Sequence, residues 1–446
     1  MIVCAMAAKG QVYETAVRSN RVGALEVRVA GERLSEPYVE LGGERQIEVT
    51  FDMLNPEPGE RLAYSVVHCD ADGRRSALVP MEYMDGFDGM EVDDASPSFN
   101  TTVPYMNYRL RLPNEQVRLK VSGVYAVEIY PEGRRNEVLL TARFNVGEGL
   151  VAISGEETAN TDVALNRGVQ QVNFAVDTKA LTVNFPQREL KVFVEQNRRP
   201  DTRVGDLQPT SIGGSRLGYE HDRRLIFEAG NEYRRFECLT YRHASMGVER
   251  IGFHNPYYHV DLRPDGPRRA YVYDEDQNGR FFAACSGCGE PAREADYGLV
   301  HFSYVSERLP GGEVYVMGDL TQNVFDERSR MTYNEASGCY EAALMLKQGY
   351  YNYGYVFVPN GERRGRMPAG DESLFEAENE YTVSVFYRPA MGRYDRLVGR
   401  VTIGGRRYKS RGHFFSPLPT FLSLMKERSA KRKSRPHRGR GKSSRA

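Results

Sequence analysis

Apolar and polar residues alternate at period two along most of this chain, and the 3.6-residue period of an amphipathic helix is scarce. Because successive side chains of a strand point to opposite faces, the alternation predicts half-buried β-strands. Clusters of Gly, Pro, Asn or Asp, such as 55–59 and 359–361, end most of the runs and favour turns. Short strands at this spacing are typical of β-sandwiches, so we expect an all-β chain. The predicted strands are 46–51, 62–68, 124–130, 139–146, 169–176, 190–196, 225–229, 299–305, 313–317, 339–346, 350–358 and 381–387.

The chain is too long for a single core, because 446 residues at roughly 100 to 200 per domain predict about three domains. A turn-rich stretch at 147–167 marks one boundary, and a second falls near 291–296. In the last block, alternating aromatic residues at 351–357 predict one aromatic strand face. We therefore expect a lead-in at 1–26, a β-sandwich at 27–150, a β-rich middle domain at 151–292, a β-sandwich at 293–403 and a C-terminal segment at 404–446.

The net charge of zero conceals two parts of opposite charge. Residues 426–446 carry ten Lys or Arg and one acid, a net charge of +9, which leaves −9 on the preceding 425 residues. A run such as KRKSRPHRGRGK is typical of a disordered, solvated tail, and the alternative is a specific contact with nucleic acid or lipid headgroups. We predict a disordered basic C-terminal tail and no nucleic-acid partner. The more apolar stretch 414–427 is expected to pack on the body of the protein.

The N-terminus is apolar but short. MIVCAMAAKGQ carries Ala5, Ala7 and Ala8, the small residues that a signal peptidase site requires, so we interpret it as the remnant of a signal peptide. A plain lead-in to the first strand is the alternative. No stretch approaches the roughly 18 apolar residues of a membrane helix, and we predict no transmembrane segment.

Cysteines and other metal-ligating residues give weak signals. Cys285 and Cys288 are close in sequence, but no second pair follows, so we expect a local disulfide or free thiols rather than a zinc or redox site. DEDQNG at 274–279 copies the start of a calcium loop, yet Cys285 stands where a bidentate Glu is needed, which favours a hairpin turn over weak cation binding. His254 and His259 lack a third ligand nearby in sequence and are interpreted as structural. We predict no metal and no cofactor.

The stretches that imitate catalytic or cofactor-binding motifs lack the flanking elements that such motifs require. Gly147-x-Gly149-x-x-Ala152 imitates a dinucleotide fingerprint, but no amphipathic helix follows it, so we expect a link between domains. HCDADG at 68–73 is explained by turn chemistry. The sequence holds no Walker A motif, no Gly-x-Ser-x-Gly elbow and no His-Glu-x-x-His. We therefore predict no catalytic residues and a protein that is not an enzyme.

Four stretches together resemble the plug protein family of the type IX secretion system. They occur in order between about residues 27 and 398, which is most of the chain. One departure is Gly73, where the family usually has a tryptophan. The stretches are VVHCDADGRRSALVPMEYMDGF, SFNTTVPYMNYRLRLPN, FEAGNEYRRFE and MTYNEASGCYEAALMLKQGYYNYGYVF.

This resemblance implies an exported, non-catalytic protein in the periplasm, at the inner face of the outer membrane. Its implied partner is the giant outer-membrane β-barrel translocon, whose channel it would close from the periplasmic side. Within GNEYRRFE at 230–237, the candidate partner-binding residues are Asn231, Glu232, Arg234 and Arg235. For the alternating charges of this motif, we favour a structural corner of ion pairs over a contact with the barrel.

The block 299–387 is also similar to early-set sandwich modules that bind glycogen-type sugars, through VYVMGDLTQNVF and YYNYGYVF. That similarity implies immunoglobulin or early-set-like sandwiches in tandem. It also names Phe325 as a sugar-contacting ring under the alternative of a glycan-binding protein of the cell envelope. The chain has 28 Tyr and 20 Phe but no Trp, the largest stacking platform, so we interpret the similarity as one of fold.

Overall fold

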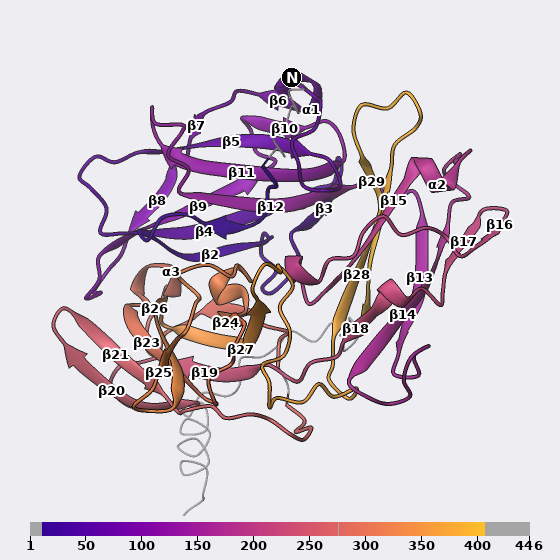
Figure 1. The fold of residues 1–446 in the computed structure, drawn as a ribbon. Helices are drawn as coiled ribbons and strands as arrows, with labels where there is room; N and C mark the ends of the chain where they lie inside the picture. The colour runs from indigo at the N-terminus through magenta and orange to yellow at the C-terminus, as the bar shows by residue number, and fades with distance from the viewer. Residues whose placement is uncertain (1–10, 275, 406–446) are drawn as a thin grey trace, which may run out of the picture. The chain divides into compact units, whose positions relative to one another are not determined.

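The structure is a computed structural model that describes residues 11–274 and 276–405 (Figure 1). Strands dominate this part of the chain, and each of its helices has four residues or fewer. The predicted all-β fold of tandem sandwiches is confirmed. No helix among the described residues is long and apolar enough to cross a membrane. The expectations for the N-terminal apolar stretch, for 414–427 and for the basic tail fall outside the described residues.

Residues 11–149 form a two-sheet sandwich that we call the first lobe. Its core lies between the sheets and includes Phe51, Tyr64, Val127 and Phe144, which are almost fully buried. One sheet has the order β1 (Ala16–Val17), β12 (Leu140–Gly147), β11 (Gly123–Pro131), β5 (Leu62–Cys69) and β7 (Met90–Glu91), with β3 (Tyr38–Glu40) beside β12. The other has the order β2 (Val22–Val29), β4 (Ile47–Leu54), β9 (Tyr105–Leu112) and β8 (Asp94–Pro97). Helix α1 (Pro80–Tyr83) precedes β6 (Met84–Gly86), which pairs with β10 (Val117–Leu119).

The second lobe is another sandwich, built from residues 150–230 and 377–405. Its core joins Phe174 of one sheet to Val192, Val383 and Val398 of the other. One sheet has the order β13 (Ala152–Thr158), β14 (Val169–Asp177), β17 (Arg216–Tyr219) and β16 (Ser211–Gly213), with β18 (Ile226–Glu228) on β14. The other has the order β15 (Leu190–Gln196), β28 (Glu380–Tyr387) and β29 (Arg396–Gly404). Short helices α2 (Pro186–Glu189), η1 (Pro200–Thr202) and η2 (Arg223–Leu225) connect its strands.

The third lobe comprises residues 231–376. Its aromatic core contains Tyr351, which stacks on Phe236 and Phe281 at ring-centre distances of 4.9 and 5.3 Å, so the predicted aromatic face of this strand is confirmed. One sheet has the order β20 (Val248–His254), β21 (Tyr257–Leu262), β23 (Tyr297–Val305), β26 (Cys339–Lys347) and β25 (Thr332–Asn334). Opposite it, β27 (Gly349–Pro359) pairs with β19 (Arg234–Cys238), β22 (Phe281–Ala283) and β24 (Gly312–Met317). Helices α3 (Pro291–Glu294) and η3 (Asp319–Thr321) lie in its loops.

The boundary predicted between 151–292 and 293–403 does not match these cores. β28 and β29 pair with β15, so residues 380–404 complete the second lobe rather than a domain at 293–403. Residues 234–262 instead pair with strands of the third lobe. The third lobe is therefore inserted into the second, and the chain crosses between them twice. Local composition cannot reveal such an insertion, because strand pairing joins residues about 190 positions apart.

The predicted strands all recur with ends shifted by three residues or fewer. Strands β2, β9, β20, β21 and β29, which were not predicted, carry charged or aromatic residues on a partly exposed face that weaken the alternation. The stretch between Gly147 and Ala152 ends β12 and begins β13, so its interpretation as a link is confirmed. Gly149 adopts a φ of +63° there, which suits glycine.

Candidate functional site at the junctions of the lobes

The motif GNEYRRFE lies where the chain first crosses from the second to the third lobe. Glu232 is only 4% exposed, and its carboxylate accepts hydrogen bonds from the Tyr271 hydroxyl at 2.9 Å and the backbone N–H of Glu378 at 3.1 Å. Residue 378 belongs to the returning crossover. Nearby, Asn379 donates to the backbone carbonyl of Ala229 at 2.8 Å. The motif therefore ties the outgoing and returning segments together.

The two arginines of the motif form ion pairs within the third lobe. Arg234 is 5% exposed and lies 3.1 Å from Asp265 and 3.6 Å from Asp371. Arg235 pairs with Asp274. These contacts are the structural ion pairs that the sequence analysis favoured for this motif. A role in partner binding stays a prediction for Asn231 and Arg235, which are partly exposed, and would require rearrangement for the buried Glu232 and Arg234.

A buried charge pair joins the first lobe to the third. Lys347 Nζ lies 2.6 Å from Asp52 Oδ2, and both side chains are at most 2% exposed. The Tyr297 hydroxyl and the Asn107 amide also donate to this carboxylate, at 2.6 and 2.7 Å. Burial raises the pKa of Asp52 and lowers the pKa of Lys347, because desolvation opposes both charges. These three polar contacts hold the charges in place.

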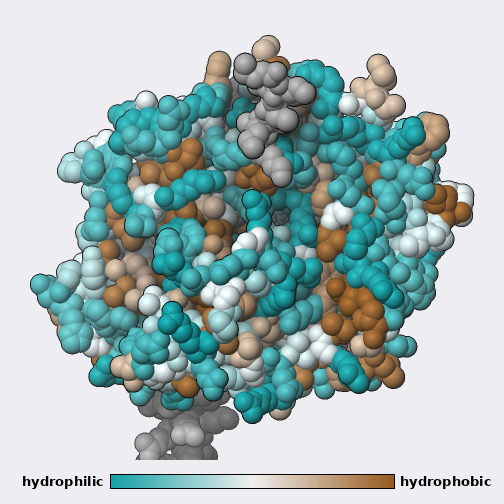
Figure 2. All heavy atoms as spheres, viewed as in Figure 1, coloured by the Kyte–Doolittle hydropathy of each residue, from teal (hydrophilic) through white to brown (hydrophobic). Residues whose placement is uncertain are grey.

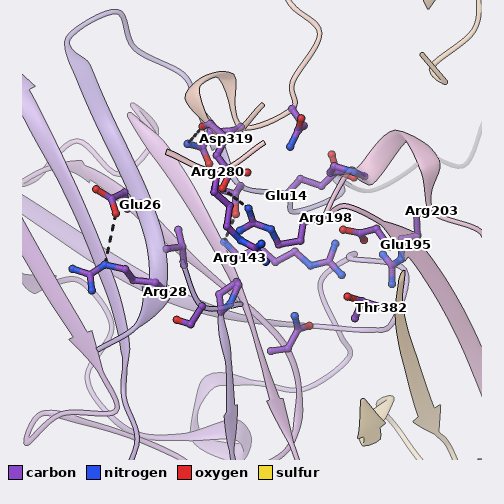
Figure 3. Close-up of a pocket in the computed structure, with 18 of the residues that line it drawn as sticks. Glu14, Glu26, Arg28, Arg143, Glu195, Arg198, Arg203, Arg280, Asp319 and Thr382 are labelled. Carbon is purple, nitrogen blue, oxygen red and sulfur yellow. Dashed lines mark hydrogen bonds and ion pairs between the residues drawn. The ribbon is translucent and has the colours of Figure 1, made fainter. Parts of the chain in front are cut away.

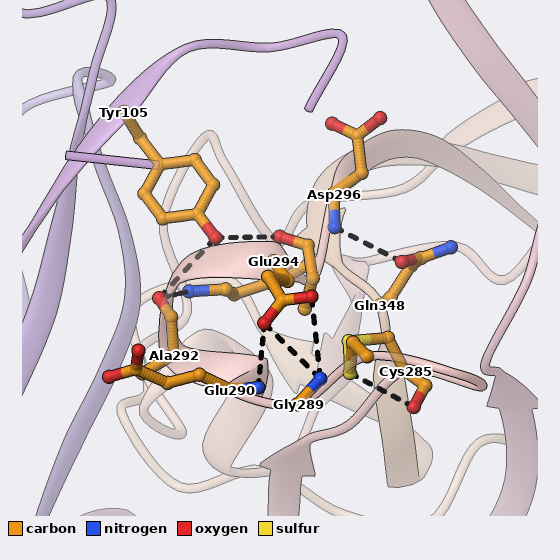
Figure 4. The surroundings of a disulfide bond; sticks show 11 residues. Tyr105, Cys285, Gly289, Glu290, Ala292, Glu294, Asp296 and Gln348 are labelled. Carbon is orange, nitrogen blue, oxygen red and sulfur yellow. Dashed lines mark hydrogen bonds between the residues drawn. A yellow bond between two sulfur atoms is a disulfide. The ribbon is translucent and has the colours of Figure 1, made fainter. Parts of the chain in front are cut away.

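The loop before β23 completes this contact (Figure 4). The Tyr105 hydroxyl of the first lobe donates to the backbone carbonyl of Ala295 at 2.8 Å, and Lys347 donates to that of Ala292. A disulfide between Cys285 and Cys288 closes the start of this loop. Of the alternatives open for these cysteines, the structure has the local disulfide. Helix α3 is thereby presented to the first lobe.

A second buried carboxylate joins the first lobe to the second. Asp395 is fully buried and lies 3.0 Å from Lys191 Nζ and 2.7 Å from Arg388 Nε. It also accepts from the backbone N–H of Ala71 at 3.0 Å, while Arg388 pairs with Asp70 at 2.7 Å. Residues 70–73 form a turn, as the sequence predicted, with Gly73 at a φ of +80°. The sequence did not reveal that this turn docks on another lobe.

Where the three lobes meet, they enclose a polar cavity of about 150 Å³ (Figure 3). Ion pairs across its walls include Arg198–Asp319 at 2.5 Å, Arg280–Glu380 at 2.8 Å and Arg400–Glu36 at 2.9 Å. The cavity has room for several water molecules. Its arginines come from all three lobes, and each of these three pairs joins residues of two lobes. Six arginines line it: Arg28, Arg143, Arg198, Arg203, Arg280 and Arg400.

Burial destabilises the ionised form of one acid that lines this cavity, Glu26. Burial raises the pKa of Glu26 to about 7, although Arg28, 3.7 Å away, acts in the opposite direction. The folded pKa exceeds the ordinary glutamate pKa of 4.5, so Glu26 favours folding fully below about pH 4.5 and loses that contribution as the pH rises through 7.

We expect the Glu26→Gln variant to remove this loss. Because 23% of the Glu26 side chain reaches solvent, the wild type should lose about 1–2 kcal/mol more than the variant between pH 5 and pH 8. Urea denaturation at both pH values measures the difference. Glu44→Gln, at an exposed site, is the control and should follow the wild type. Parallel pH profiles for wild type and Glu26→Gln would contradict the prediction.

The buried nucleophiles and bases of the described residues are poorly placed for catalysis. Burial raises the pKa of the Cys69 and Cys238 thiols to about 12, which keeps them protonated and unreactive. Ser76 lies 2.8 Å from His68 Nδ1 and copies a serine–histidine pair. Both residues are buried, however, and burial lowers the pKa of His68 to about 4, so neither substrate nor solvent reaches this pair.

The structure does not support the predicted roles of Phe325 and of residues 274–279. Phe325, the candidate sugar-contacting ring, is partly buried against Tyr315 with ring centres 5.6 Å apart, beside a small core of Tyr233, Met317 and Val356. It is therefore no free stacking platform. The stretch 274–279, of which 275 is not described, is an irregular loop with a turn at 278–279 rather than a hairpin.

Exposed apolar side chains lie at the start of α1 and on the β28–β29 loop, two segments that Arg393 connects. Met81 and Met391 are 79% and 95% exposed. Arg393, two residues after Met391, donates to Glu82 and to the backbone carbonyl of Ala77. We call Val79, Met81 and Met391 the methionine patch. On the face shown in Figure 2, the surface is mostly hydrophilic and hydrophobic residues form separate groups.

Comparison with known families bears on the first lobe. The model of the type 9 secretion system plug protein first domain matches residues 22–148, which coincide with its two sheets. This chain carries the first domain of the type IX secretion plug family. The resemblance inferred from the four stretches is confirmed, and the plug family associates the protein with the type IX secretion translocon.

A crystal structure of a hypothetical protein from Parabacteroides merdae is similar to this plug-family protein. The two share 47% sequence identity with a TM-score of 0.87, over 89% of this chain and 100% of that one. A second solved structure, of the alkylpurine DNA glycosylase AlkC from Pseudomonas fluorescens bound to DNA containing an abasic site analog, aligns over 28% of this chain and 30% of its own. The sequence identity of 13% and the TM-score of 0.15 are too low to indicate a shared fold. No curated protein matches the chain.

Proposed function

We propose that this protein is a non-catalytic plug that closes the periplasmic side of the type IX outer-membrane translocon. The family membership carries the proposal. The buried contacts support it, because a plug must keep its shape against a channel. Asp52–Lys347 fastens the first lobe to the third, and Asp395 fastens the first to the second. A double crossover joins the second lobe to the third, so all three lobes are held as one body.

The proposed location is the periplasm, at the inner face of the outer membrane. The Cys285–Cys288 disulfide agrees with it, because such bonds persist in oxidising compartments that include the bacterial periplasm. Cys69, Cys238 and the His68–Ser76 pair are buried and out of reach of a substrate, which supports a protein without enzymatic activity. The methionine patch supplies a surface for the barrel, because exposed, flexible methionines adapt to a partner surface.

Two experiments test the proposal. Deletion of the gene in a strain with an intact translocon should increase entry of small antibiotics that the outer membrane normally excludes, and affinity purification of the barrel should recover the protein. The Met81→Glu/Met391→Glu variant should lose this recovery while it keeps its thermal stability. Phe185→Glu, at a site 63% exposed on another part of the second lobe, is the matched control and should be recovered.

Unchanged permeability together with no recovery would reject the plug function. Equal recovery of the Met81→Glu/Met391→Glu variant and the wild type would reject only the methionine patch as the contact surface.

A further inference from the structure

Three histidines that are scattered in sequence come together on the outer face of the third lobe. His259 Nδ1 and His301 Nε2 are 2.9 Å apart, and their rings are stacked with centres 5.1 Å apart. The ring of His254 lies 5.1 Å from that of His259 in an edge-on orientation. Of these three residues, only His254 and His259 lie close together in the sequence. His301 joins them only through the parallel pairing of β21 with β23.

The strand register explains why these rings share one face. His259 lies opposite Gly252 on β20, and His301 lies opposite Asp261 on β21, two residues from His259. Residues opposite each other project to the same face of a sheet, and residues two apart along a strand do as well. The neighbouring residues Val260, Val300 and Phe302 point into the core, so the histidines face outward.

Small residues leave the histidine pair accessible. Gly252 lacks a side chain, and a Cβ atom there would stand 3.4 Å from His254 Nε2, so the His254 ring folds back over this position beside His259. On the other side, Ala343 of β26 lies opposite His301 and is exposed. The imidazole rings therefore lie between two positions of minimal bulk.

The chemistry of this arrangement suits a borderline transition metal. Neutral imidazole is a preferred ligand of Zn²⁺, Cu²⁺ and Ni²⁺, with metal–nitrogen distances of about 2.0–2.1 Å. Two nitrogens on one tetrahedral ion then lie about 3.3 Å apart. His259 and His301 therefore need to separate by a few tenths of an ångström, and the proton of their hydrogen bond must move to the other nitrogen of its ring. In the described residues, no three of His, Cys, Asp and Glu stand ready to hold an ion without movement, so His254 must rotate to become the third ligand.

The charged neighbours are compatible with a cation. Asp261, opposite His301, is paired with Arg250 at 2.7 Å. Glu341 of β26 is held by the Asn334 amide at 3.1 Å and the Ser337 hydroxyl at 2.8 Å. Neither acid is needed as a ligand. Arg250 offsets the charge of Asp261, whereas Glu341 is held by neutral groups and adds negative potential near the site.

We infer that His259 and His301, with His254 as a third ligand, form a surface site for a divalent transition-metal cation of the zinc, copper and nickel class. An ion there would cross-link β21 to β23 and, through His254, to the β20–β21 turn. This site does not depend on the plug function, because neither the translocon nor the methionine patch takes part in it.

Calorimetric titration of the untagged full-length protein with ZnCl₂ and NiCl₂ tests the site. We expect one site with a micromolar dissociation constant and a rise in the melting temperature of several degrees at saturating metal. His259→Ala and His301→Ala should each weaken binding at least tenfold, and His254→Ala should weaken it less. His243→Ala, at an exposed histidine outside the cluster, is the control and should bind like the wild type.

Ala343→Lys provides a second variant that leaves all three histidines in place. It sets a cation beside His301 at an exposed position and should weaken binding without altering the circular dichroism of the metal-free protein. No binding at 1 mM metal would overturn the inference. Retained binding in a His259→Ala/His301→Ala double variant, or equal loss in His243→Ala, would also overturn it.

Discussion

Asp52→Ala should lower the free energy of unfolding by about 3–5 kcal/mol, because it leaves Lys347 buried without its counter-charge. The lysine would keep the backbone carbonyl of Ala292 and the faces of the Tyr105 and Tyr297 rings, 4.2 and 5.9 Å from Nζ, none of which carries a counter-charge. The Tyr297 hydroxyl and the Asn107 amide would lose an acceptor as well. Urea denaturation, followed by tyrosine fluorescence, measures the loss.

Two variants separate the buried pair from general effects of mutation. Arg45→Ala removes an exposed ion pair with Glu32 and should cost less than about 1 kcal/mol. Asp52→Leu/Lys347→Met replaces both charges by apolar groups and should recover most of the stability lost in Asp52→Ala. If Asp52→Ala and Arg45→Ala cost the same, the buried pair does not hold the first lobe to the third.

Asp395→Ala should loosen the contact between the first and second lobes and cost about 2–4 kcal/mol. Its cations Lys191 and Arg388 are 35% and 29% exposed and can recover hydration, so the cost should be smaller than for Asp52. The backbone N–H of Ala71 would lose its acceptor. Hydrogen exchange should accelerate at 70–76 and at 389–395.

The same variant tests whether the plug needs rigidity. If the three lobes must stay fixed to close a channel, cells with Asp395→Ala should admit more small antibiotic even though the variant still co-purifies with the barrel. Arg366→Ala, which breaks a largely exposed ion pair with Glu362, is the control and should leave permeability unchanged. Faster exchange without any increase in leakage would show that this contact is dispensable for closure.

Strand content and strand position were predictable because alternation is a local property. A half-buried strand requires apolar residues at every second position, and a turn requires residues such as Gly, Pro or Asn that accept its backbone angles. The strands 190–196 and 350–358 were therefore placed within one residue of β15 and β27. The same reasoning explained the turn at 70–73.

The candidate site was only partly predictable. GNEYRRFE was singled out, but its role depends on residues 378 and 379, which return from the inserted lobe. Asp52 and Lys347 look like ordinary strand residues in the sequence, and their pairing spans 295 positions. A charged residue in an otherwise apolar strand was the one signal available, and it does not name its partner.

The sequence by itself determined the all-β character, the aromatic strand 351–357, the absence of common catalytic motifs and, through four motifs, the plug family. The tertiary structure decided which strands share a core, that the third lobe is inserted into the second, and that Asp52, Asp395 and Glu232 hold the lobes together. It also brought His301 beside His259. The physical reason is that periodicity records which face of a strand is buried, whereas pairing and burial of charge depend on residues far apart in the chain.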